Sequence, residues 1–182
     1  MRILACLFLL AFCCSASAAQ PYNLHSVTLL QPQSIVSERV QPVEKLASYI
    51  DRVDEAASRS LAHSPAKPTS GYIAIAVRPG RVSKAWLDLS PALPRPLEAR
   101  VTAAIEAVRP FAAKRGVVIF ALNVILWGAP PTKQQWPRPA MWLRAVKKAG
   151  HSLTIDEVVN RVWPPAPGTS QFLGDLPSIP PA

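Results

Sequence analysis

Residues 117–127 read VVIFALNVILW, a run of eleven residues that is rich in β-branched and aromatic types. Such residue types favour a strand. Apolar side chains would occupy both faces of this strand, and a strand of that kind needs cover on each side. The run therefore predicts a strand in the centre of a sheet, with helices or a dimer partner on its second face.

The segments just before this run predict its neighbours in the sheet. Residues 71–77 and 82–89 are two extended-type runs, and the Pro79-Gly80 pair between them is typical of a hairpin. A Pro-rich entry follows at residues 90–96, and apolar residues then recur at helical spacing up to about Arg109. The order strand, strand, helix, strand is a ββαβ core.

Further helices are predicted on both sides of this core. The apolar positions of residues 43–61 are three or four apart, which is typical of one face of a helix. After a Pro-rich loop, we expect a short basic helix to about Lys148 and a second helix over residues 155–163. Thr154 and Glu157 fit a capping box at the start of the second helix.

The length and composition predict one α+β domain, with a small antiparallel sheet packed by helices, between Pro-rich flanks. Of the 182 residues, 49% are hydrophobic, which supports one core and excludes a wholly disordered chain. The domain covers residues 43–163. An arm with extended runs at 24–30 and 35–40 covers residues 19–42, and residues 164–182 form a tail that we expect to be disordered.

Residues 1–18 have the pattern of a cleaved secretory signal. A positive charge precedes an apolar run over residues 3–14, and small residues then allow cleavage after Ala18 or Ala19. The run is too short to cross a bilayer, so we expect no transmembrane segment in the mature chain and a periplasmic or secreted protein. All three cysteines lie in the removed part, so the mature chain would have no thiol.

Residues 43–127 resemble the C-terminal domain of TonB-type energy transducers, whose core is a ββαβ unit. The similar features are Gly71 before an alternating strand, the Pro79-Gly80 turn, the helix entry at residues 90–97, and Arg109-Pro110-Phe111 before Gly116 and a long closing strand. The chain departs from that pattern in having no Tyr-Pro pair before its hairpin and a cleavable rather than anchored N-terminus. The resemblance implies a fold and a habit of protein–protein contact.

No catalytic constellation, metal cluster or cofactor motif is visible in the sequence. His25, His63 and His151 are expected in the arm, a linker and a helix junction, and no serine has the Gly-x-Ser-x-Gly setting of a nucleophile elbow. Asn123 is a polar residue inside the central strand, and we interpret it as a hydrogen-bonded buried amide or a residue at a strand-edge contact rather than as a pocket anchor. We therefore expect no cofactor and no catalysis; a hydrolase of unrecognised type is an alternative.

Positive charge is concentrated in residues 71–148, which carry thirteen basic and three acidic side chains. This asymmetry predicts an anionic partner, although the charge could also serve solubility alone. Two groups at predicted turns are candidate binding residues, namely Arg78, Arg81 and Lys84 at the hairpin and Arg109, Lys114 and Arg115 at the helix-to-strand turn. Whether these turns share one end of the sheet depends on the topology.

A third candidate group mixes cations with aromatic side chains: Lys133, Trp136, Arg138, Trp142, Arg144, Lys147 and Lys148. Such a mixture suits sugars, lipid headgroups or exposed bases. The alternative is a surface helix whose Met141 and Trp142 pack inward, and we favour this interpretation.

These patterns predict an exported interaction module whose basic central surface binds an acidic protein partner, in transport, secretion or toxin neutralisation. One alternative is a binder of envelope lipid or cell-wall polymer that uses residues 133–148. The sequence carries no signal of specific nucleic-acid binding, and it does not define the oligomeric state.

Overall fold

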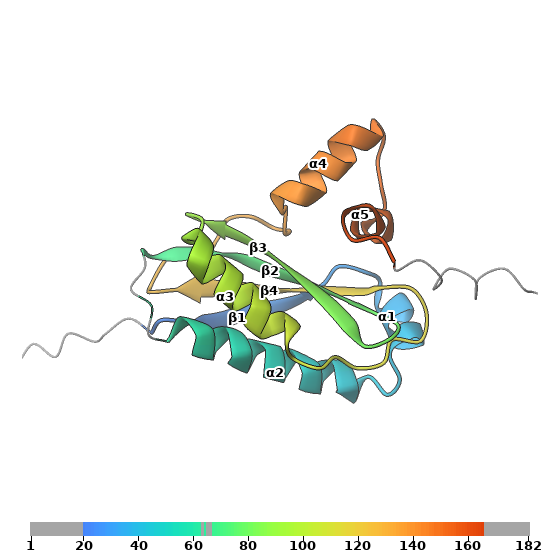
Figure 1. Ribbon diagram of the computed structural model, residues 1–182, viewed down its shortest axis with the longest axis horizontal. Helices are drawn as coiled ribbons and strands as arrows, with labels where there is room; N and C mark the ends of the chain where they lie inside the picture. The colour runs from blue at the N-terminus through green and yellow to red at the C-terminus, as the bar shows by residue number, and fades with distance from the viewer. Residues whose placement is uncertain (1–19, 63, 65–66, 166–182) are drawn as a thin grey trace, which may run out of the picture.

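A four-stranded antiparallel sheet forms the centre of the computed structural model, which describes residues 20–62, 64 and 67–165 (Figure 1). The strands are β1 (Asn23–Leu29), β2 (Thr69–Arg78), β3 (Val82–Ser90) and β4 (Val118–Leu126). They lie in the order β1-β4-β2-β3. The predicted central strand is confirmed, because β4 pairs on both sides and eight of its nine residues are buried.

Helices cover both faces of the sheet, which confirms the α+β class. They are α1 (Gln33–Arg39), α2 (Glu44–Leu61), α3 (Arg95–Glu106), α4 (Ala140–Ala149) and α5 (Ile155–Val162). Figure 1 shows α2 and α3 on one face and α4 and α5 on the other. The second face of the central strand, which the sequence assigned either to helices or to a dimer partner, is covered by helices.

The larger core lies between the sheet and the helices α2 and α3. Its sheet side consists of alternate residues of β2 and β4, and its helix side includes Val53, Val101 and Ile105, all fully buried. The ring of Tyr49 meets Phe111 and Phe120 edge-on, with ring centroids 5.6 and 6.1 Å apart. Full burial of a large apolar side chain stabilises the folded state by about 1.5–3 kcal/mol relative to leaving it in water. The larger core, which buries many such side chains, therefore dominates the stability of the fold.

A smaller core lies under α4 and α5. The strand β2 contributes the small side chains of Ala74 and Ala76 to it, so large aromatic side chains fill the space. Trp86 of β3 contacts Trp142 edge-on, with ring centroids 5.4 Å apart. The inward packing predicted for Trp142 is confirmed, but it is wrong for Met141, which is exposed.

The N-terminal segment differs from the predicted arm. The first extended run is confirmed as β1, but β1 pairs with β4 and so belongs to the sheet. The extended conformation predicted for residues 35–40 is wrong, because α1 begins after Pro32 and ends at Arg39, with Val40 as its C-cap. Val36 and Val40 are four residues apart and both buried, so helical spacing lets them reach the core together.

Polar contacts attach α5 to the sheet and to α1. The predicted capping box is confirmed, since Thr154 accepts a hydrogen bond from the Glu157 backbone and the Glu157 carboxylate accepts one from the Thr154 backbone. Asp156, in the same first turn, accepts hydrogen bonds from Gln31 at 2.5 Å and from Arg39 at 2.7 Å. These bonds join residues more than a hundred positions apart.

Within the described ranges, no helix combines the length and apolar character needed to cross a membrane. The predicted signal at residues 1–18 and the predicted tail beyond residue 165 lie outside the described residues.

Candidate functional site

The two predicted clusters of turn cations meet at one end of the sheet. Val77, near the end of β2, pairs with Val118 at the start of β4. The hairpin turn that follows β2 and the segment that leads into β4 therefore lie side by side. The N-terminal half of α2 borders the same end, and a pocket lies between these three segments.

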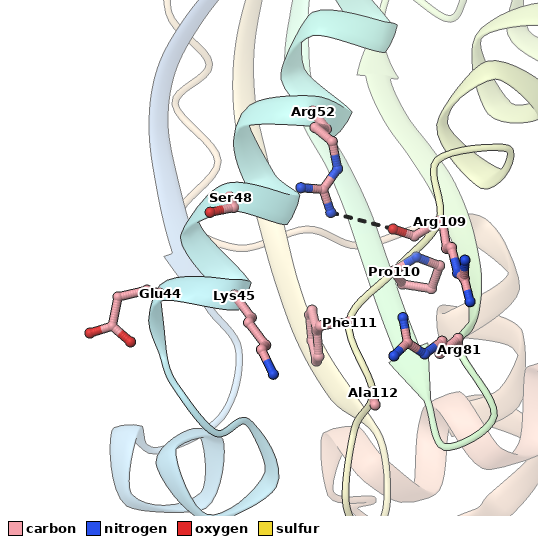
Figure 2. A pocket seen from close by; sticks show the side chains of 9 residues that line it. All are labelled: Glu44, Lys45, Ser48, Arg52, Arg81, Arg109, Pro110, Phe111 and Ala112. Atoms are coloured by element: carbon pink, nitrogen blue, oxygen red, sulfur yellow. Dashed lines mark hydrogen bonds between the residues drawn. The ribbon is translucent and has the colours of Figure 1, made fainter.

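This pocket, which we call the cationic pocket, has a volume of about 480 Å³. Its lining residues are Glu44, Lys45, Ser48, Arg52, Arg81, Arg109, Pro110, Phe111 and Ala112. Figure 2 shows Lys45 and Arg52 on the α2 side, Arg81 and Arg109 on the opposite side, and Phe111 between them.

The pocket carries four exposed positive charges: Lys45, Arg52, Arg81 and Arg109. None of the four forms an ion pair with a residue in the described part of the chain, whereas Arg39, Arg59 and Lys84 each do. The carboxylate of Glu44 points away from the four cations (Figure 2). The pocket therefore presents uncompensated positive charge to solvent.

The local backbone explains how α2 contributes to this pocket. Lys45, Ser48 and Arg52 are three and four residues apart, so they share one face of the helix. One guanidinium nitrogen of Arg52 also donates a hydrogen bond of 3.4 Å to the backbone carbonyl of Arg109. This bond joins α2 to the opposite wall of the pocket.

The floor of the cationic pocket is apolar. Pro110 and Phe111 are buried, and Phe111 packs edge-on against Tyr49 in the larger core. Arg81 lies in the hairpin turn at the rim of the pocket. Its φ of 59° is a left-handed backbone conformation, which costs free energy for any residue that has a Cβ atom. The site thus combines a fixed apolar floor with a cationic rim.

The predicted hairpin cations have three different environments. Arg81 lines the cationic pocket, while Lys84 forms an ion pair with Glu106, with nitrogen and oxygen 3.0 Å apart. Arg78 is buried and donates a hydrogen bond of 2.7 Å to the side chain of Asn160. Burial lowers the pKa of Arg78 from its ordinary value, because removal of water disfavours the charged form.

The predicted cations at the helix-to-strand turn are all exposed, but only Arg109 lines the pocket. The side chain of Lys114 donates a hydrogen bond to Gln41, and its backbone nitrogen donates one of 2.9 Å to the Arg39 carbonyl. Arg115 lies next to them, outside the pocket lining.

Sequence reasoning missed Lys45 and Arg52. Their segment has balanced charge, so it gave no signal of positive surface. The available signal was their spacing with Ser48 beside the apolar face of α2, which places basic side chains at the border of the core.

The third predicted group forms a separate surface around α4. Trp142 is buried, whereas the other six members, Lys133, Trp136, Arg138, Arg144, Lys147 and Lys148, are exposed. Together with the exposed Met141, Leu143 and Val146, these six residues form what we call the α4 surface. Asp88 fixes the loop before α4, because its carboxylate accepts hydrogen bonds from Gln134 at 2.6 Å and from the Arg138 backbone at 2.5 Å.

The polar residues considered for catalysis are dispersed. His25 and His151 are exposed, and His63 lies outside the described residues. The amide of Asn123 is buried as expected, but the hydrogen bonding expected for it is missing at its side-chain oxygen, which has no partner among the described residues. No group of three or more His, Cys, Asp or Glu residues in the described ranges is arranged to hold a metal ion.

Comparison of the chain with known proteins finds no matching family model, no matching curated protein and no matching solved structure. The resemblance of residues 43–127 to the TonB-type domain therefore stays a prediction from the sequence.

Proposed function

We propose that this protein is an exported, non-catalytic interaction module that binds an acidic segment of a partner protein in the cationic pocket. The observation that carries the proposal is the convergence of four cations from three segments, none of them ion-paired within the described part of the chain. Export is supported by the signal pattern at residues 1–18.

Electrostatics favours a negatively charged ligand at this place. Four like charges around one pocket repel each other, and the single carboxylate among the lining residues, Glu44, forms no ion pair with any of them. A ligand with several carboxylates would relieve that repulsion and gain charge-assisted hydrogen bonds. Three of the four cations are arginines, whose planar guanidinium groups match a carboxylate with two parallel hydrogen bonds.

The shape of the site favours a protein segment over a small molecule. Sites for small molecules enclose most of the ligand surface. Here all four cationic side chains are exposed, and only the floor, formed by Pro110 and Phe111, is buried. An acidic loop or peptide could place an apolar side chain on this floor and its carboxylates on the rim, as in protein–protein interfaces with an apolar centre. The TonB-like resemblance supports the same class of partner.

The test measures binding of a fluorescein-labelled octaglutamate peptide by fluorescence anisotropy at fixed ionic strength. The pocket variant carries Arg81→Glu and Arg109→Glu. The control carries Lys67→Glu and Arg95→Glu, two exposed positions outside the pocket that change the net charge equally. We expect the pocket variant to raise Kd by about tenfold or more and the control by about twofold, because only the former removes direct contacts.

Equal weakening in the two variants would contradict the proposal, since the peptide would then sense only net charge. Competition by pyrophosphate distinguishes an acidic protein segment from a small phosphorylated anion as the ligand. If pyrophosphate displaced the labelled peptide completely at a concentration much lower than that at which unlabelled octaglutamate does so, the pocket would be assigned to a small phosphorylated anion instead.

A further inference from the structure

The α4 surface gathers most of the large apolar side chains that are exposed. Seven such side chains are exposed among the described residues, and four of them lie within residues 136–146: Trp136, Met141, Leu143 and Val146. Single exposed apolar residues are ordinary, whereas four within eleven residues of the chain indicate an interaction site. Trp136 is 55% exposed, which is unusual for the largest apolar side chain.

The same segment is free of negative charge. From residue 107 to residue 155 the chain contains no Asp or Glu, and the α4 surface holds five cations. Arg144, Lys147 and Lys148 follow Trp142 by two, five and six positions, which places them on the side of α4 opposite the buried Trp142. Leu143 lies next to this basic side, whereas Val146, four positions after Trp142, lies at the border of the buried side and is 37% exposed.

The packing of α4 leaves this surface open. Trp142 is the buried residue of the ten in α4, and the helix is held by its contact with Trp86 and by α5. Figure 1 shows α4 projecting from the sheet on the face opposite α2 and α3. An isolated helix of ten residues is marginal in water, so this docking keeps an amphipathic helix formed and presented outward.

We infer that the α4 surface binds the surface of a lipid bilayer that carries anionic headgroups. Helices that lie in the plane of such a surface insert apolar side chains at the boundary of the headgroups and hold Lys and Arg against the headgroup charges. Trp is favoured at the same depth because its ring is apolar and its N–H is polar. The α4 surface combines all three features within residues 133–148.

This inference is independent of the proposed function. The cationic pocket lies between α2, the hairpin turn and the entry to β4, whereas α4 covers the other face of the sheet. The two surfaces can therefore be occupied together, and each can fail its test without the other.

The first test uses a photo-crosslinking phenylalanine derivative, placed in the full chain at Val146 or at Val27. These positions have similar exposure, 37% and 39%, but Val27 lies on β1, away from the α4 surface. The probes are vesicles of phosphatidylglycerol and phosphatidylcholine in equal parts, and vesicles of phosphatidylcholine alone. We expect lipid adducts from Val146 with the anionic vesicles and few from Val27. A local probe is needed because the apolar run at residues 3–14 can itself enter lipid.

The second test measures partition of variants into the same anionic vesicles by sedimentation. Lys147→Gln with Lys148→Gln should weaken vesicle binding by about fivefold for each charge removed, because each cation held near an anionic bilayer strengthens binding by about fivefold. Leu143→Ser with Val146→Ser should weaken it similarly, whereas Lys67→Gln with Arg95→Gln should have little effect. Near-UV circular dichroism checks that every variant keeps the packing of its tryptophans.

Three results would overturn the inference. One is equal labelling from Val146 and Val27, and another is equal labelling from Val146 with and without phosphatidylglycerol. The third is attachment of octaglutamate rather than lipid at Val146 when both are present, which would assign the α4 surface to a protein.

Discussion

Arg78 lies over the ring of Trp163, with its guanidinium carbon 4.3 Å from the ring centroid. The same guanidinium donates its hydrogen bond to Asn160, so a single side chain of β2 holds both α5 and the residue that follows it. A guanidinium keeps its charge even when burial lowers its pKa, and stacking on an aromatic ring lets that charge be buried without a carboxylate. Arg78 is therefore a structural residue rather than a ligand contact.

Replacement of Arg78 should destabilise the fold. We expect Arg78→Ala to lower the free energy of unfolding by about 2–4 kcal/mol, since it removes a desolvated cation–π contact and a charged hydrogen bond. Arg78→Lys should restore less than half of this loss, because an ammonium group cannot stack flat on Trp163. Urea denaturation followed by tryptophan fluorescence measures both values. An Arg78→Ala protein as stable as Arg95→Ala, a variant of an exposed arginine, would contradict this role.

The stability of the chain at alkaline pH should depend on Tyr22. Burial, together with the hydrogen bond to Asp54, raises the pKa of Tyr22 above its ordinary value of 10.0. The unfolded chain therefore loses this proton first, and the stability that Tyr22 provides is present below pH 10 and lost as the pH rises above it. The stability gap between the natural chain and Tyr22→Phe should narrow between pH 9 and pH 11, as measured by urea midpoints. A stability difference that stayed constant over this pH range would show that the Tyr22 hydroxyl has the same pKa in the folded and the unfolded chain.

Arg81 should lower stability while it supports binding. Its left-handed backbone costs about 1 kcal/mol that glycine would not incur, and its charge adds to the repulsion around the cationic pocket. Arg81→Gly is thus expected to raise the free energy of unfolding and to weaken octaglutamate binding by about fivefold. Arg109→Ala, at a position without a left-handed backbone, should weaken binding without the same gain. Tighter peptide binding by Arg81→Gly would be incompatible with the proposed site.

The docking of α4 should depend on Trp142 alone among its residues. We expect Trp142→Ala to release α4, so that its backbone amides exchange with deuterium at rates close to those of an unfolded segment. The amides of β2 and β4 should stay protected, because the larger core does not include α4. Hydrogen–deuterium exchange with mass spectrometry makes the comparison, and Trp142→Phe should recover part of the protection. Loss of protection throughout the sheet would show that α4 belongs to the main cooperative unit.

Much of this fold was predictable because its signals are local. The run at residues 117–127 marks the central strand through side-chain type, Pro79-Gly80 marks the hairpin, and the pair Thr154 and Glu157 marks the start of α5. The strand prediction for residues 35–40 was wrong because an apolar pattern of only six residues is compatible with either a strand or a helix. Only the burial of Val36 and Val40 together decides between them.

The candidate site was less predictable because it depends on contacts between distant segments. Arg81 and Arg109 could be listed from sequence, but their meeting at one end of the sheet follows from the strand order. Lys45 and Arg52 come from a segment of balanced charge and join the site only through the packing of α2. Arg78 looked like a third member of the hairpin cluster, yet Asn160 and Trp163, more than eighty residues further along the chain, bury it.

The most direct test of the central claim is a nuclear magnetic resonance titration of the ¹⁵N-labelled protein with octaglutamate. The account predicts that the largest amide shifts gather at Lys45, Arg81, Arg109 and Ala112, and that Arg81→Glu with Arg109→Glu abolishes them. Shifts that spread over all exposed cations in proportion to charge, or that gather on the α4 surface, would contradict the assignment of the cationic pocket to an acidic protein segment.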